Sequence, residues 1–266
     1  MSEDEHQEVH ADGEMGFLEH IAELRTRLLW SALAIAILSI IGWSFSKETF
    51  DLLSQPFFAA FHDNILIGTG PAEAFLLRLK VAVLTGTLLS LPIIFQQCWL
   101  FISPGLHESE RKFAFPFILI TSGLFFLGVW FCYSVVLPYA FEFFYSQYEA
   151  VGAVTPTIRI SEFLSLLTKV LLGFGIAFET PVLAFILGRL GVLTSSMLLA
   201  AGRYAIIFIF FISALLTPPD VLTQFLMAGP LLLLYGISIV IVHFTGRKRE
   251  DGESQEDKTS DSPTNI

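Results

Sequence analysis

Long apolar runs separated by short polar segments dominate the pattern of the chain. An α-helix needs about 20 apolar residues to cross a bilayer, and runs of that order recur here. The pattern predicts six spans, at residues 28–45, 75–101, 113–137, 162–187, 204–216 and 222–244. The runs are too long for barrel strands, and in lipid a helix satisfies its own backbone hydrogen bonds. The chain is therefore predicted to be an all-α polytopic membrane protein with six transmembrane helices.

The fifth and sixth spans are predicted to be short or broken. Residues 204–216 make only 13 residues of helix before Pro218 and Pro219, about 20 Å against a hydrocarbon core of about 30 Å. The sixth span is interrupted at Gly229 and Pro230. A short hairpin either thins the bilayer or leaves a wet, concave face. We therefore expect a concave, cupped bundle.

The basic residues near the span ends predict the orientation, because cytoplasmic loops carry an excess of Lys and Arg. On one side lie Arg25, Arg27, Arg111, Lys112, Arg189, Arg203, Arg247, Lys248 and Arg249, and on the other Lys47 and Arg159. Nine basic residues against two predict that both termini are cytoplasmic.

Composition and charge indicate an acidic tail at each end of the chain. Of the 266 residues 54% are hydrophobic, and the mean hydropathy is +0.68. The net charge of −10 reflects acidic ends, with six acids in residues 1–14 and six in residues 250–261. We expect disordered tails at 1–14 and 247–266 around a membrane domain at 15–246. The acidic N-terminus does not resemble a signal peptide, which begins with basic residues.

Two charged segments on the predicted cytoplasmic side are candidate binding elements. In FLEHIAELRTRLL, residues 17–29, apolar residues recur at helical spacing, and Glu23 and Arg27 form an i, i+4 pair. This segment also fits an interfacial helix that leads into span 1. In QCWLFISPGLHESERKF, residues 97–113, aromatic residues approach a charged loop. A loop needs charge to stay in water, so a purely solvated loop remains an alternative.

Glu179, in FGIAFETPV, lies about two-thirds of the way along span 4, with Pro181 two residues later. An ionisable residue inside a span is a functional candidate by default, and Pro181 removes a backbone hydrogen bond to Ala177. The alternative is a neutral glutamic acid that is bonded to a neighbour in its own helix. Lys169 lies off the Glu179 face of the helix, so a salt bridge within the helix is not expected.

The turn LLTPPDVLTQF, residues 215–225, carries polar groups between spans 5 and 6. Asp220 is placed to cap a helix, and Gln224 is an amide inside a span, which usually bonds a neighbouring helix. A purely structural turn would also explain this segment. Cys98 and Cys132 have no metal or disulfide spacing. No nucleotide-binding motif or catalytic arrangement is present, so we expect no enzyme, no metal and no cofactor.

These stretches together resemble the TatC family, the polytopic core of the twin-arginine protein translocase. The resemblance rests on EHIAELRTRL, QCWLFISPGLHESER, FGIAFETPV and LLTPPDVLTQ, in this order, between residues 17 and 244. It implies a receptor and scaffold in a bacterial cytoplasmic (inner) membrane that binds Arg-Arg signal peptides of folded proteins. It also implies single-span TatA- and TatB-type partners, a homo-oligomer within the complex, the proton gradient as driving force, and no nucleic acid.

The resemblance also assigns residues by motif position. It places signal-peptide binding at Glu23, Arg25, Phe101 and Glu110, with Glu108 as a second acid nearby. It places intramembrane polar or partner contacts at Glu179, Pro181, Thr217, Asp220 and Gln224, and structural positions of the outward half at Pro56 and Lys80. Two carboxylates on separate elements could each bind one guanidinium through charge-assisted, bidentate hydrogen bonds.

Two other classes compete with this interpretation. A proton-coupled small-solute transporter would use Glu179 as its relay, but such a path needs more than one acid in the central halves of the spans. An intramembrane protease would need a nucleophile with a base, or paired aspartates, and the spans show neither.

Overall fold

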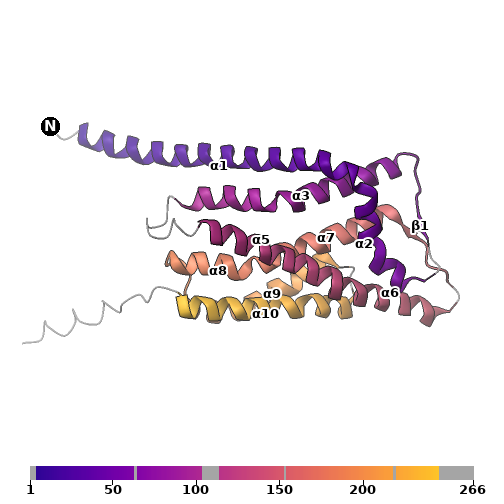
Figure 1. Ribbon diagram of the computed structural model, residues 1–266. Helices are drawn as coiled ribbons and strands as arrows, with labels where there is room; N and C mark the ends of the chain where they lie inside the picture. Colours follow the sequence, from indigo (N-terminus) through magenta and orange to yellow (C-terminus); the bar gives the residue numbers. More distant parts are fainter. Residues whose placement is uncertain (1–3, 63–64, 104–113, 153, 218–219, 246–266) are drawn as a thin grey trace, which may run out of the picture.

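The computed structural model describes residues 4–62, 65–103, 114–152, 154–217 and 220–245, with side chains from residue 19 onward (Figure 1). Almost all of this part of the chain is helical, and six helical segments are long and apolar enough to cross a membrane. The prediction of six spans is confirmed. The spans are Glu19–Ser44, Glu73–Ile102, Ala114–Val151, Ile160–Arg189, Ser195–Leu216 and Val221–Thr245.

The first three spans contain four α-helices and a π-helical turn. Helix α1 (Asp4–Ser44) packs along α3 (Glu73–Ile102), and the third span is α5 (Ala114–Phe131), η2 (Cys132–Val136) and α6 (Leu137–Val151). The π turn ends at Val136, two residues before Pro138, which lies in the first turn of α6 and has no backbone N–H to donate. The sequence predicts the end of this span at residue 137, whereas the helical segment continues to Val151.

The last three spans follow with one break. Helix α7 (Ile160–Phe178) and α8 (Thr180–Arg189) form the fourth, α9 (Ser195–Leu216) the fifth, and α10 (Val221–Thr245) the sixth. The division between α7 and α8 falls at Glu179, as expected from Pro181. In Figure 1, α10 returns to the end of the bundle at which α1 begins.

The prediction that spans 5 and 6 are short is wrong. Helix α9 has 22 residues, about 33 Å of helix at about 1.5 Å per residue. It begins at Ser195 because the Thr194 hydroxyl oxygen accepts a hydrogen bond from the Met197 N–H. The polar residues Ser195, Ser196 and Arg203 lower the hydropathy of the first turns of α9, so the apolar pattern does not indicate that the helix begins there. Helix α10 has 25 residues and continues through Pro230.

Two further differences lie outside the spans. Helix α1 begins at Asp4, so most of the segment 1–14 that was expected to lack structure is helical. Helix α2 (Ser46–Ala60), which the hydropathy pattern does not predict, packs against α6 and α3 at the opposite end of the bundle from the start of α1 (Figure 1). The predicted tail at 247–266 lies outside the described residues.

The core of the bundle lies around α7. The span Ile160–Arg189, which contains α7, has the largest share of buried residues, 44%. Phenylalanines from α2, α6 and α7 pack in one cluster, in which Phe57 contacts Phe141 and Phe163. Beside it, β1 (Leu66–Ile67) and β2 (Ile158–Arg159) form a short parallel pair. By contrast, α1 and α9 contribute little to the core, because only 6% of each span is buried. Most of their side chains therefore lie on the surface of the bundle.

Candidate functional site

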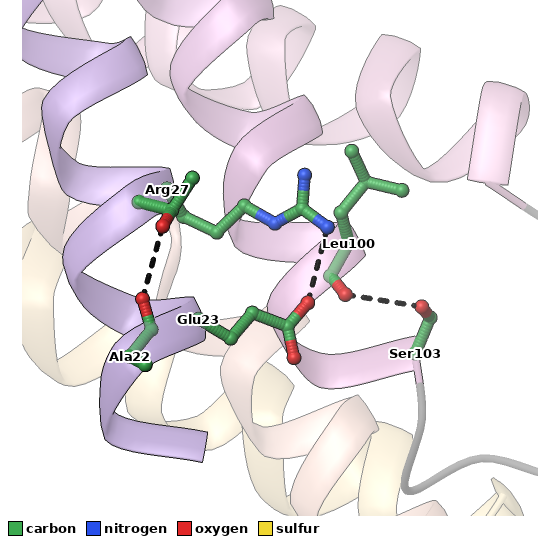
Figure 2. A network of polar contacts seen from close by, with 6 residues as sticks. Ala22, Glu23, Arg27, Leu100 and Ser103 are labelled. Atoms are coloured by element: carbon green, nitrogen blue, oxygen red, sulfur yellow. Dashed lines mark hydrogen bonds and ion pairs between the residues drawn. The ribbon is translucent and has the colours of Figure 1, made fainter. Parts of the chain in front are cut away.

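The first candidate site lies where α1 crosses the end of α3. The Glu23 carboxylate accepts a hydrogen bond from the Arg27 guanidinium at 3.0 Å, and both side chains are 30% exposed. Figure 2 shows this pair beside the end of α3, where Ser103, the residue after the helix, donates a hydrogen bond to the Leu100 carbonyl. The predicted i, i+4 pair is therefore formed, and it leaves the Arg27 Nε enclosed with no hydrogen-bond partner among the described residues.

An aromatic stack joins the same two helices. The His20 and Phe101 rings lie 4.3 Å apart and 15° from parallel. Phe101 is one of the residues assigned to signal-peptide binding, and the stack brings it beside the helix that carries Glu23. Arg25 is exposed on the same stretch of α1. Glu108 and Glu110, the acids assigned to the adjoining loop, lie outside the described residues.

The second candidate site surrounds Glu179, between α7 and α8. The residue is only 8% exposed, and its Oε1 atom is buried without a hydrogen-bond partner among the described residues. This oxygen therefore does not bond a neighbour in its own helix, which was the alternative expected from the sequence. An unpartnered polar atom within a membrane span is costly, so Glu179 is a candidate binding residue.

A large groove opens beside Glu179, and the pattern of the sequence does not predict which residues line it. Its volume is about 970 Å³, and its lining comes from α3, α5, the end of α7, α8 and α10. Phe178 and Pro181, on either side of Glu179 in sequence, both line it, as do Gly229 and Pro230. Among its lining residues only Arg189 is charged. The one signal in the sequence is the pair Gly229-Pro230 inside the sixth span, which predicts a break but instead lines the groove.

The polar residues of the turn between α9 and α10 bond within the chain. Asp220 accepts a hydrogen bond from the Thr223 N–H at 2.7 Å, which confirms the predicted helix cap. The Gln224 amide donates to the Phe210 carbonyl of α9 at 2.9 Å, and the Thr217 hydroxyl donates to the Ser213 carbonyl at 2.8 Å. Gln224 thus links two neighbouring helices of this chain.

The two positions assigned to the outward half differ in environment. Pro56 is buried inside α2, next to Phe57 in the core. Lys80 is exposed on α3, in the second turn of the helix. Among the described residues, neither forms a hydrogen bond or an ion pair with a residue of the two candidate sites. They are therefore separate from both.

The fold and these sites define a multi-pass membrane protein with an ion pair on α1 and an apolar groove beside Glu179. The family model for the Sec-independent protein translocase protein (TatC) matches residues 19–230. The chain belongs to the TatC family. It is therefore a subunit of a protein translocase, a transport protein and not an enzyme.

The sequences of curated relatives align with nearly the full length of this chain. The Sec-independent protein translocase protein TatC of Desulforapulum autotrophicum is 38% identical over 249 residues, 93% of this chain and 92% of its own length. The protein of the same name from Campylobacter jejuni is 39% identical over 242 residues, 89% of this chain and 97% of its own length. A crystal structure of the twin arginine translocase receptor TatC superposes with a TM-score of 0.77 at 37% identity, over 84% of this chain and 97% of the other.

Proposed function

We propose that this chain is the receptor subunit of a twin-arginine translocase and binds Arg-Arg signal peptides where α1 meets the end of α3. The observation that carries the proposal is the contact between Glu23 and Arg27, in which a guanidinium donates to the carboxylate at 3.0 Å. At this half-buried position the carboxylate already accommodates the group that it would have to recognise. Arginine suits such a site better than lysine, because its planar fork can make two parallel hydrogen bonds to one carboxylate.

The remaining residues of the site complete a surface for an extended peptide. Phe101, stacked on His20, presents an apolar face beside Glu23, and Arg25 lies exposed on the same helix. We assign the second arginine of the peptide to Glu110, with Glu108 as an additional acid in the same loop. Two carboxylates on separate segments select for two adjacent guanidiniums, and a single carboxylate does not.

The proposal is tested by binding of a signal peptide to the purified protein in detergent. Replacing Arg-Arg by Lys-Lys should prevent co-purification. Glu23→Ala and Glu110→Gln should each weaken binding about 10-fold or more, since a hydrogen bond to a charged group contributes about 1.5–3 kcal/mol. Glu19→Ala, one turn earlier and exposed on α1, is the matched control and should bind normally. Equal binding of both peptides to the wild-type protein would refute the proposal.

For the second site we propose contact with the transmembrane helix of a TatA- or TatB-type single-span subunit. The groove suits an apolar helix, and Glu179 lies between two of its lining residues. Glu179→Ala should leave peptide binding intact and impair assembly or transport. Cysteines at Thr217 and Gln224 should crosslink to a single-span subunit. Loss of peptide binding in Glu179→Ala would assign Glu179 to the structure of the bundle instead.

The setting of this function is also part of the proposal. We place the protein in a bacterial cytoplasmic membrane with both termini in the cytoplasm, and in a homo-oligomeric complex driven by the proton gradient. The even number of spans and the return of α10 to the starting end of α1 support termini on one side. The groove supports a concave bundle. The concavity does not come from short fifth and sixth spans, because α9 and α10 have 22 and 25 residues.

A further inference from the structure

The guanidinium of Arg78, on α3, is held against the end of α1 and the start of α2. Its Cζ atom lies 4.8 Å from the centroid of the Trp43 ring, and its Nε donates a hydrogen bond to the Ser46 hydroxyl oxygen at 3.2 Å. Ser46 is only 1% exposed, so it is a fixed anchor. Trp43 and Ser46 thus hold one face and one edge of the guanidinium.

The positive charge of Arg78 has no carboxylate partner in the described part of the chain, where the ion pairs are Arg27 with Glu23 and Arg159 with Glu162. The two Nη groups of Arg78 also have no hydrogen-bond partner among these residues. Arg78 is exposed, so a ligand from outside the chain can reach both groups. The planar fork of an arginine matches the oxygens of a phosphate group.

The position of Arg78 along α3 places these donors at the level of the lipid headgroups. The span Glu73–Ile102 has 30 residues, about 45 Å of helix against a hydrocarbon core of about 30 Å. A helix of this length centred in the bilayer extends about 7 Å, or about five residues, beyond the core at each end. Arg78 is the fifth residue after Glu73, so it lies at the edge of the core. Trp43 fits the same depth, because tryptophan is enriched at membrane interfaces.

Apolar surface next to the cation favours a lipid over a free phosphate ion. The Phe75 ring lies 5.6 Å from the Trp43 ring and is 59% exposed. Ile40, almost one turn further into the membrane on α1, is 73% exposed. A headgroup bound at Arg78 therefore has apolar side chains of α1 beside it for its acyl chains, whereas a free phosphate would use none of this surface.

We infer that Arg78, Trp43 and Ser46 form a binding site for the phosphate group of a membrane phospholipid, in the leaflet at the α2 end of the bundle (Figure 1). Arg78 supplies the charge and the free Nη donors, and Trp43 and Ser46 are positioning residues. The inference does not depend on the proposed receptor function, because the site lies at the other end of α1 from Glu23. None of the three residues lines the groove beside Glu179.

The test is rotational-echo double-resonance NMR between ¹⁵N-labelled arginine side chains and lipid ³¹P. The full chain, without other subunits, is reconstituted into vesicles of phosphatidylcholine and phosphatidylglycerol in phosphate-free buffer. The Arg78 signal is identified by its loss in Arg78→Lys, and ³¹P should dephase it. The matched control is Arg159, which is exposed and lies 3.9 Å from the Glu162 carboxylate. Its signal, identified by its loss in Arg159→Lys, should be dephased several-fold less.

Two further arms test the positioning residue and the source of the phosphate. Trp43→Leu should lower the occupancy of the Arg78–phosphate contact about 2-fold, because it removes the cation–π contact that holds the guanidinium. Trp130→Leu, at a position that is 61% exposed on α5, should not change it. In vesicles of a phosphate-free galactolipid with added inorganic phosphate, the Arg78 signal should not be dephased.

Three outcomes would overturn the site. Wild-type Arg78 that is dephased no more than Arg159 would mean that no phosphate binds there. Equal dephasing by inorganic phosphate in galactolipid vesicles would mean a site for the free ion instead of the lipid. Equal dephasing in Trp43→Leu and Trp130→Leu would mean an unpositioned surface cation. The wild-type measurements decide the first two outcomes even if Trp43→Leu does not fold.

Discussion

The Arg27 guanidinium lies 3.0 Å from the Glu23 carboxylate, one turn away on α1. The residue proposed to bind a signal-peptide arginine is thus already bonded to an arginine of its own chain. An incoming guanidinium must displace Arg27 or share the carboxylate with it. Binding of the peptide therefore competes with an internal ion pair.

We expect Arg27→Ala to tighten binding of an Arg-Arg peptide about 2-fold, since an i, i+4 ion pair on a helix contributes about 0.3–0.5 kcal/mol. The measurement is isothermal titration with purified protein in detergent. In a Glu23→Ala background the same change should have no effect, because the carboxylate for which both arginines compete is gone. Weaker binding by Arg27→Ala alone would show that Arg27 supports the site instead of competing for it.

The His20–Phe101 stack gives a second prediction. Phe101→Ala should weaken peptide binding about 2- to 10-fold, since an aromatic pair contributes about 0.5–1.5 kcal/mol beyond its buried area. His20→Phe should retain the stack and the affinity. The matched control is Phe115→Ala, a residue that is 76% exposed at the start of α5. If Phe101→Ala and Phe115→Ala bound the peptide equally well, the stack would have no part in the site.

The close crossing of α1 and α3 predicts a stability difference between two glycines. A Cβ atom at Gly86 would lie 2.5 Å from the backbone nitrogen of Ser39, whereas one at Gly123 would have no atom within 4 Å. Gly86→Ala should therefore destabilise the protein by about 1–3 kcal/mol, the usual cost of overpacking. Gly123→Ala should be neutral or slightly stabilising, because alanine favours the helix. Thermal unfolding in detergent measures both, and equal melting temperatures would contradict the close crossing.

The proposed orientation predicts which ends of the bundle react with a membrane-impermeant thiol reagent. In a Cys98→Ser/Cys132→Ser background, Glu48→Cys on α2 should be labelled from outside intact cells. Glu19→Cys on α1 should be labelled only after the membrane is opened. Both positions are exposed, so access to the reagent is the only difference. The reverse pattern would invert the topology.

The sequence by itself determined the features that depend on neighbouring residues in the chain. Apolar runs fixed the number of spans, because the bilayer sets the length of any helix that crosses it. Pro181 marked the break between α7 and α8, and Asp220 marked a helix start, since both act on backbone groups a few residues away. The four ordered motifs identified the family before any contact was known.

The tertiary structure decided everything that needs two distant segments to meet. The start of α9 was missed because polar Ser195 and Ser196 look like loop residues until a cap places them in a helix. The groove arises where residues from five helices, α3, α5, α7, α8 and α10, line one space. No pattern along the chain encodes these contacts, because a helix periodicity defines a face but does not say which other helix covers it.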